Sequence, residues 1–204
     1  MKERWWERLG VAAGVGLFGA AGLGYVNRAA HEVQWGPRAM YAAFGLYAAF
    51  GALRLAGRRR APAGGVAGLL PSAIVVAGVL CPLAARPEGR MLWNGGLWLA
   101  AAGALLGVAA TVALGESFGI VPARRGVVCR GPYAVIRHPM VVSFLAIAAG
   151  FLVSHYSLRN AAVLGVAVVL AVASAFLEER HLRKDEEYVG YAARVRWRFI
   201  PGLV

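Results

Sequence analysis

The chain has 204 residues, of which 59% are hydrophobic and only 16% are charged, and its formal net charge is +12. In a soluble domain about a quarter of the residues are usually charged. A single core of roughly 200 residues cannot bury so much apolar surface. The composition therefore argues against a soluble enzyme and against a disordered tail. The basic residues form short clusters between long uncharged runs, so membrane phosphate is a better counterion than nucleic acid.

The uncharged runs predict the fold class. A helix needs about 20 predominantly apolar residues to cross a bilayer, and six such runs follow one another at residues 9–27, 39–53, 61–85, 91–115, 139–158 and 160–177. A signal peptide is disfavoured for the first run, because its end is a poor cleavage site and five more runs follow. We therefore expect an all-α, polytopic membrane bundle of about six transmembrane helices, with a four-span region at 1–114 and a second region at 115–204 that ends in a cytosolic helical segment.

The distribution of basic residues predicts the orientation of this bundle. Of the 22 Lys and Arg residues, 17 lie in the N-terminal segment and in the alternate segments that follow it, including the C-terminal tail. Because Lys and Arg concentrate on the cytoplasmic side, both termini are expected in the cytoplasm. The scarcity of lysine and the abundance of Ala, Gly and Val suggest a bacterial protein, and hence the inner membrane.

Pairs of glycines separated by three other residues recur inside the runs, as at Gly103 and Gly107. Small residues at this spacing let two helices approach closely, and packing is the role we expect for them. A formal G-x-G-x-x-G occurs at residues 14–19. It lies within a membrane run rather than between a strand and a helix, so it does not indicate a dinucleotide site.

Two polar stretches interrupt the membrane pattern, the loop at 115–138 and the tail from residue 178 onward. The loop is long for a connection between bundle helices. Runs 139–158 and 160–177 are similar in length and are joined by only a few residues, so they should form a tight hairpin. Arg137 and His138, before the first run, are therefore expected to face Glu178 and Glu179, after the second.

Each of these motifs also has a simpler interpretation. Arg137 and His138 are typical juxtamembrane residues before a helix that starts at Pro139, and Glu179 can form an i,i+4 pair with Arg183 on a solvated helix. The two cysteines have no partner at zinc-ligand spacing, so no metal site is expected. Only the combination of the loop and tail motifs indicates a functional site.

That combination resembles the isoprenylcysteine carboxyl methyltransferase family, together with its bacterial relatives and phospholipid methyltransferases. The likeness covers roughly residues 115–201. Val141 stands where the family has a tyrosine, and the stretch between Leu182 and Tyr188 is shorter than usual. The matching residues are G-P-Y at 131–133, R-H-P at 137–139, E-E-R-H-L at 178–182, and Tyr188, Tyr191, Val195, Arg198 and Pro201 in the tail.

The resemblance implies a membrane-embedded methyltransferase. It implies S-adenosyl-L-methionine as methyl donor, S-adenosyl-L-homocysteine as product, and a lipophilic or lipidated acceptor, such as the carboxylate of a prenylcysteine-like molecule. Arg137 and Glu178 are implied as catalytic residues, with Arg137 and Val141 at the acceptor, since arginine binds a carboxylate in bidentate fashion. The cofactor site is implied at Val127, Val128, Gly131, Tyr133, His138, Pro139, Glu178 and Glu179.

Other functions stay open on the sequence alone. Within the methyltransferases, the acceptor can be an amine, as in phospholipid N-methylation. Outside them, the chain can be a small non-catalytic transport or assembly protein, or a lipid-modifying enzyme with another cofactor. A transporter should carry polar residues or broken helices in mid-membrane, and runs 61–85 and 139–158 contain no charged residue, which disfavours transport. Membrane lipids are expected partners, and nucleic acid is not.

Overall fold

A computed structural model describes residues 85–86, 88–115 and 127–203, together with a few positions between residues 16 and 31. Its regular elements are α4 (Gly96–Leu114), the short 3-10 helix η3 (Gly131–Ala134), α5 (Pro139–Ser154), α6 (Leu158–Leu182) and α7 (Glu186–Arg194). Over these described ranges the chain forms helices and two isolated bridges but no strand. The predicted runs at 9–27, 39–53 and 61–85 lie wholly or largely outside the described residues.

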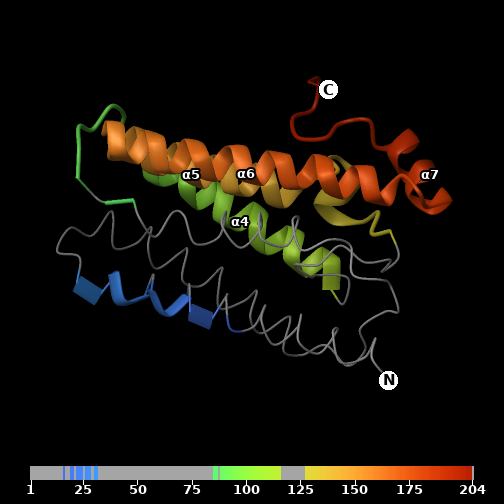
Figure 1. The fold of residues 1–204 in the computed structure, drawn as a ribbon, viewed down its shortest axis with the longest axis horizontal. Helices are drawn as coiled ribbons and strands as arrows, with labels where there is room; N and C mark the ends of the chain where they lie inside the picture. The colour runs from blue at the N-terminus through green and yellow to red at the C-terminus, as the bar shows by residue number, and fades with distance from the viewer. Residues whose placement is uncertain are drawn as a thin grey trace.

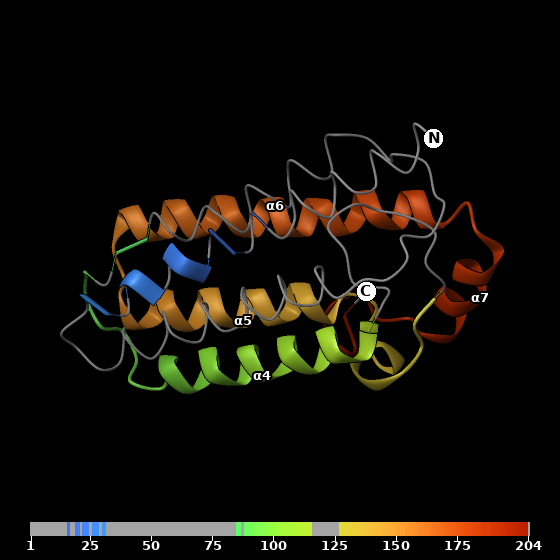
Figure 2. The same ribbon diagram turned by 90° about the horizontal axis from the view of Figure 1, so that it is seen from below.

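The three long helices lie lengthwise beside one another, with α5 between α4 and α6 (Figures 1 and 2). Two of them, α4 and the stretch Leu158–Arg180 of α6, are long and apolar enough to cross a membrane, whereas α5 has only 16 residues. The predicted all-helical class is thus confirmed for the described part of the chain. The predicted number of six spans stays a prediction.

Small residues bring α4 and α5 into close contact. A Cβ atom added at Gly103 would lie 2.8 Å from the backbone oxygen of Ser143, closer than real Cβ contacts allow. The Ser143 hydroxyl donates a hydrogen bond of 2.7 Å to the Gly103 carbonyl. Gly96 and Gly150 approach each other in the same way nearer the opposite end of the pair. The packing role predicted for Gly103 is therefore confirmed.

The connection between α5 and α6 is the tight hairpin that the sequence predicts. Helix α5 ends at Ser154, four residues before the end of the predicted run, and α6 begins at Leu158. The turn is held by Asn160, whose side chain is fully buried. Its amide donates to the carbonyls of His155, at 2.7 Å, and Arg86, at 2.8 Å, while its oxygen accepts from the Arg86 N–H at 3.0 Å.

Helix α6 extends past the predicted end at residue 177 to Leu182, so Glu178 and Glu179 lie within the helix rather than after it. No glycine or proline interrupts this stretch, and Leu, Glu and Arg all favour helices. Consecutive residues of a helix point about 100° apart. The two glutamates must therefore face different surroundings, and the site depends on which of them faces α5.

Helix α7 lies just beyond the C-terminal end of α6 (Figure 2). Asp185 caps it by accepting a hydrogen bond of 3.1 Å from the Glu187 N–H, which satisfies one of the free donors of the first turn. The helix buries Tyr188 and Tyr191, which form a small core with Val195. A C-terminal segment follows and runs back over the ends of α5 and α6.

Candidate functional site

The site begins at the turn that precedes α5. Gly131 has a φ of +59°, a left-handed conformation that glycine adopts without steric cost, and it opens η3. Tyr133, within η3, is buried. Its backbone carbonyl accepts a hydrogen bond of 2.8 Å from the Tyr191 hydroxyl. This bond fixes the turn against α7, 58 residues further along the chain.

Residues 195–199, which we call the tail strap, pair with the backbone just before α5. The N–H of Arg137 donates to the carbonyl of Trp197 at 2.9 Å, and the N–H of His138 donates to that of Arg198 at 3.0 Å. A parallel bridge joins Ile136 to Trp197. These donors lie at the start of a helix, where N–H groups have no intrahelical acceptor, so the tail strap satisfies them.

The guanidinium of Arg137 binds the tail strap and α6 together. Its Nε donates to the Val195 carbonyl at 2.8 Å, one Nη donates to the Arg196 carbonyl at 2.7 Å, and the other donates to Glu179 at 2.9 Å. The side chain is only 8% exposed. Three protein acceptors thus surround Arg137, one on each of its nitrogens.

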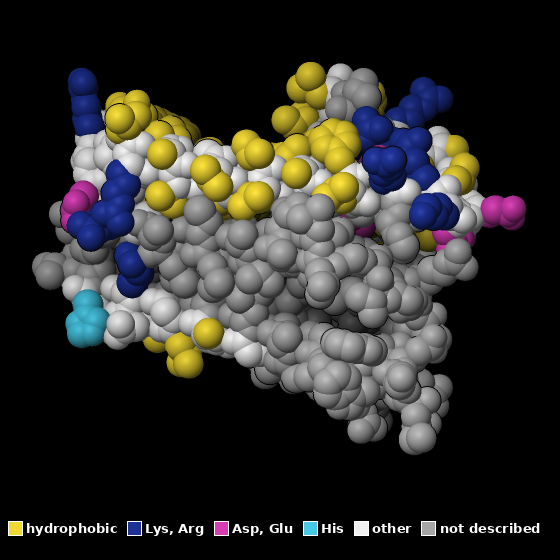
Figure 3. Space-filling view, viewed as in Figure 1, with side chains coloured by type: hydrophobic (Ala, Val, Ile, Leu, Met, Phe, Trp, Pro, Cys, Tyr) yellow, Lys and Arg dark blue, Asp and Glu magenta, His cyan; other side chains and the backbone are white. Residues whose placement is uncertain are grey.

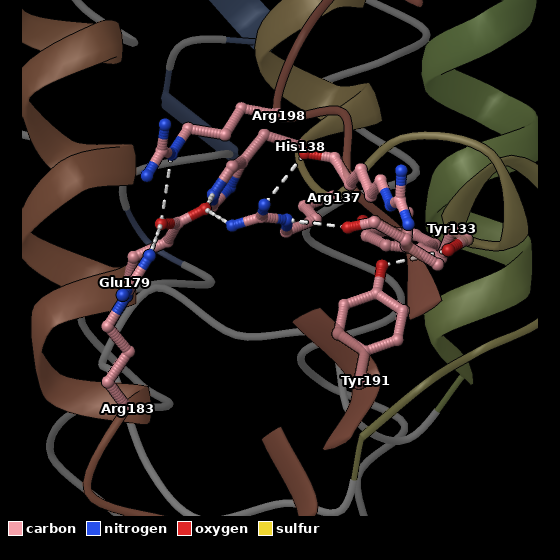
Figure 4. A network of polar contacts seen from close by, with 9 residues as sticks. Tyr133, Arg137, His138, Glu179, Arg183, Tyr191 and Arg198 are labelled. Carbon is pink, nitrogen blue, oxygen red and sulfur yellow. Dashed lines mark hydrogen bonds and ion pairs between the residues drawn. The ribbon is translucent and has the colours of Figure 1, made fainter. Parts of the chain in front are cut away.

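Glu179 is the acidic centre of the site, with a side chain that is 4% exposed (Figure 4). One oxygen accepts from Arg137 and lies 3.3 Å from Nε2 of His138. The other accepts from Nε of Arg198 at 3.1 Å and lies 3.5 Å from Arg183. The expected meeting of Arg137 and His138 with a carboxylate is therefore observed, and so is the i,i+4 pair of Glu179 with Arg183.

The charges of this network do not balance. Three guanidinium groups, those of Arg137, Arg183 and Arg198, share the single carboxylate of Glu179, which leaves a surplus of two positive charges. Arg137 is enclosed, but Arg198 is 21% exposed and Arg183 is 55% exposed. The surplus charge therefore faces the open side of the site, where it can attract an anionic group.

Aromatic rings line the edge of the network. Phe199 lies 5.7 Å from the His138 ring and 6.0 Å from the Phe176 ring, between centroids. The guanidinium of Arg198 lies 5.6 Å from the centre of the Phe176 ring, a distance suited to a cation–π contact. The site thus joins a positive surface to an apolar one.

The buried tyrosines of α7 lie next to the site and support it. Burial raises the pKa of the Tyr191 phenol to about 12 and also raises the pKa of the Tyr188 phenol, because a charged phenolate is unfavourable in an apolar core. Val127 packs against this pair, and its N–H lies 3.4 Å from a carboxylate oxygen of Glu187. Val127, in the loop before α5, is thereby held close to α7.

The expected site residues divide into those that the network joins and those that it does not. His138 and Pro139 are buried at the start of α5, while Val128 and Val141 are half-buried and Gly131 is exposed. Glu178, expected to be catalytic, is exposed and makes no hydrogen bond or ion pair with another described residue. The carboxylate that meets Arg137 is that of Glu179.

Two features of the site were not predicted from the sequence: the contact of Arg198 with Glu179, and the hydrogen bonds from Arg137 to the Val195 and Arg196 carbonyls. Arg198 is visible in the sequence only as part of the tail motif. Backbone acceptors carry no signal in a sequence, because every residue has one.

Residues 88–185 match the family model described as phospholipid methyltransferase. Over this stretch the chain is similar to phospholipid methyltransferases. It contains α4, η3, α5 and α6, and with them Arg137, His138 and Glu179, whereas most of α7 and the tail strap follow it. The match to a phospholipid methyltransferase model and the two membrane-length helices of the described residues together indicate a membrane protein. No curated protein and no solved structure matches the chain.

Proposed function

We propose that the protein is an S-adenosyl-L-methionine-dependent membrane methyltransferase that acts on a lipophilic acceptor at the membrane surface where α6 ends. One observation carries the proposal. A buried carboxylate, a histidine and two arginines of the stretch that matches phospholipid methyltransferases meet at the end of an apolar helical hairpin, and Arg198 joins them from beyond that stretch. Both termini are expected on this side, which in a bacterium would be the cytoplasmic side of the inner membrane.

The chemistry of the donor fits the groups that surround the network. S-adenosyl-L-methionine supplies an activated methyl group on a sulfonium, together with a carboxylate, an ammonium and an adenine ring. The surplus positive charge at Arg198 and Arg183 suits the carboxylate. The exposed carboxylate of Glu178 suits the ammonium. The backbone of Val127, Val128 and Gly131 is the proposed edge for the adenosine, beside Tyr133.

The roles of the network residues follow from how fully each one is paired. Arg137 and Glu179 have protein partners on every polar side-chain group that can bind, so we assign them as positioning residues that hold the tail strap. His138 and Pro139 fix the start of α5, where they would help to hold the donor. Among contacts with the described residues, Arg198 makes a hydrogen bond only through Nε and its two Nη groups make none, so Arg198 is our candidate for contact with the donor or the acceptor. Val141, in the first turn of α5, is the proposed neighbour of the acceptor.

Methyl transfer is an in-line displacement in which the acceptor atom forms a bond to the methyl carbon as the carbon–sulfur bond breaks. Such a reaction depends mainly on orientation and on a fixed electrostatic environment. A carboxylate acceptor needs no proton transfer, and an amine acceptor loses one proton. A prenylcysteine-like or other lipid carboxylate is one acceptor that the site suits. The amine of a phospholipid is the second candidate, favoured by the description of the matching family.

Binding and turnover test the proposal separately. Detergent-purified protein should bind S-adenosyl-L-methionine saturably by calorimetry, and should transfer labelled methyl groups from it to a membrane lipid extract. Arg198→Gln and Glu178→Gln should each weaken binding by about tenfold or more, as expected when one charge-assisted hydrogen bond is lost. Glu186→Gln, which changes an exposed acid of α7, is the matched control and should bind normally.

Two outcomes would overturn the proposal. Absence of saturable binding by the wild-type protein would show that S-adenosyl-L-methionine is not its methyl donor. Binding that is unchanged in both Arg198→Gln and Glu178→Gln would remove the assigned site, even if the protein methylates a lipid.

A further inference from the structure

The exposed face of α6 changes from apolar to basic towards its C-terminal end. Leu158, Val166 and Val169 are between 55% and 82% exposed, and Phe176 is 49% exposed. Arg180 follows Phe176 by four residues and continues the same face of the helix, and Arg183 follows directly after the end of α6. The space-filling view shows this transition, with apolar side chains along α6 giving way to a group of Lys and Arg at its end (Figure 3).

The C-terminal segment lies on this face at the point of transition. Arg198 and Phe199 both contact the ring of Phe176, at 5.6 Å and 6.0 Å from its centre. The chain then turns, with a hydrogen bond of 3.0 Å from the Leu203 N–H to the Ile200 carbonyl. The side chains of this turn point away from the protein, since Ile200 is 51% exposed and Leu203 is 63% exposed.

The surroundings of the turn are positively charged. Every acidic side chain exposed at this end, among the described residues, belongs to Glu178, Glu186 or Glu187. Exposed basic side chains are more numerous there, and they are those of Arg130, Arg180, Arg183, Lys184, Arg194 and Arg196. An apolar tip with a basic rim is the composition of segments that lie in the interface of an anionic membrane.

We propose that residues 199–203, which we call the tail anchor, insert Ile200 and Leu203 into the bilayer interface, and that Arg180 and Arg196 gather anionic phospholipids around them. The occupant is a lipid surface rather than a protein partner for two reasons. The anchor continues the face of α6 that is exposed along its apolar length, and its rim carries the charge opposite to that of an anionic leaflet. This inference is independent of the proposed methyl transfer.

Fluorescence quenching tests which lipid surrounds the anchor. A variant in which Trp197 is the only tryptophan is placed in nanodiscs of phosphatidylcholine and phosphatidylglycerol at one fixed ratio. Bromine atoms, which quench tryptophan, are carried either by the one lipid or by the other. Each basic side chain near an anionic surface contributes about 1 kcal/mol, or roughly a fivefold preference. We therefore expect clearly stronger quenching per brominated lipid when phosphatidylglycerol carries the bromine.

Charge and apolar variants separate the two parts of the anchor. Arg180→Gln combined with Arg196→Gln should abolish the lipid preference. Arg159→Gln, which removes an exposed charge at the other end of α6, is the matched control and should preserve it. Ile200→Ser combined with Leu203→Ser should reduce quenching by both lipids, because the segment leaves the interface.

A second measurement avoids the tryptophan substitutions. In the wild-type protein, amide hydrogen exchange of residues 199–203 should be slower, by about fivefold, in nanodiscs that contain phosphatidylglycerol than in phosphatidylcholine alone. Equal quenching by the two brominated lipids, or exchange that does not depend on lipid charge, would overturn the proposal. Absence of quenching by either lipid would also overturn it, since water or a protein partner would then cover the anchor.

Discussion

The pairing of Arg137 with Glu179 makes a strong prediction about stability. Arg137→Gln removes a charge that is 8% exposed from a carboxylate that is 4% exposed. Loss of one partner from a buried ion pair costs about 3–5 kcal/mol. Here Glu179 keeps His138, Arg198 and Arg183, so the lower end of that range, about 3 kcal/mol, is expected. For a chain of this size each kcal/mol lowers the melting temperature by roughly 2–4 °C, which gives a decrease of about 6–12 °C.

The assay combines thermal unfolding in detergent with amide hydrogen exchange. Because Arg137 also holds the carbonyls of Val195 and Arg196, the exchange of residues 195–199 should accelerate in Arg137→Gln more than that of α4. Arg159→Gln is the control and should change neither quantity. The double variant Arg137→Met with Glu179→Leu should not recover the loss, because His138, Arg183 and Arg198 then lose their carboxylate partner as well. A melting temperature and tail exchange equal to those of the wild type would refute the assignment of Arg137 as the residue that holds the tail strap.

Three further predictions concern the framework of the site. Asn160→Leu should lower the free energy of unfolding by about 3 kcal/mol in denaturant titration, because buried backbone groups of the hairpin would lose their partner at ~1–3 kcal/mol each; unchanged stability would contradict that role. Gly150→Val should cost about 1–3 kcal/mol, since its side chain would meet Gly96 on α4, whereas Gly165→Val, at an open position of α6, is the control. Tyr191→Phe should cost about 1 kcal/mol through the lost bond to the Tyr133 carbonyl. The same variant should be less sensitive to alkaline pH. The pKa of Tyr191 is raised from 10.0 to about 12, so its contribution is complete below pH 10 and is lost as pH rises towards 12; equal alkaline loss in both proteins would show that Tyr191 is not responsible.

The hydrogen bonds of Arg137 within the protein change the role that its sequence motif suggests. A sequence that places Arg-His-Pro before a helix suggests an arginine that binds substrate. In the structure that arginine already has an acceptor on each of its three nitrogens, and Arg198, from the tail, reaches the same carboxylate with more of its surface exposed. The residue that completes the site therefore comes from a segment that the family match at 88–185 does not include.

The hairpin and its end could be predicted because they follow from chain length. Two apolar runs of similar length with a short connection must return to the same membrane surface, and this alone brings residues 137–138 near residues 178–179. The helix ends were predicted less well, since α5 stops at Ser154 and α6 continues to Leu182. Apolar composition shows where a helix contacts lipid, but polar helix formers extend a helix beyond that limit without changing the hydropathy pattern.

By itself the sequence determined that this is a helical membrane chain, that its last two long helices form a hairpin, and that its polar motifs meet at one end, because hydropathy and connection length are local properties. Only the tertiary structure decided which of two adjacent glutamates forms the centre of the site. Their side chains point about 100° apart on α6, and the packing of the hairpin turns Glu179 inward and leaves Glu178 exposed. The tertiary structure likewise decided the partners of Arg137, because those carbonyls lie nearly 60 residues away in the chain and come into reach only when α7 folds back.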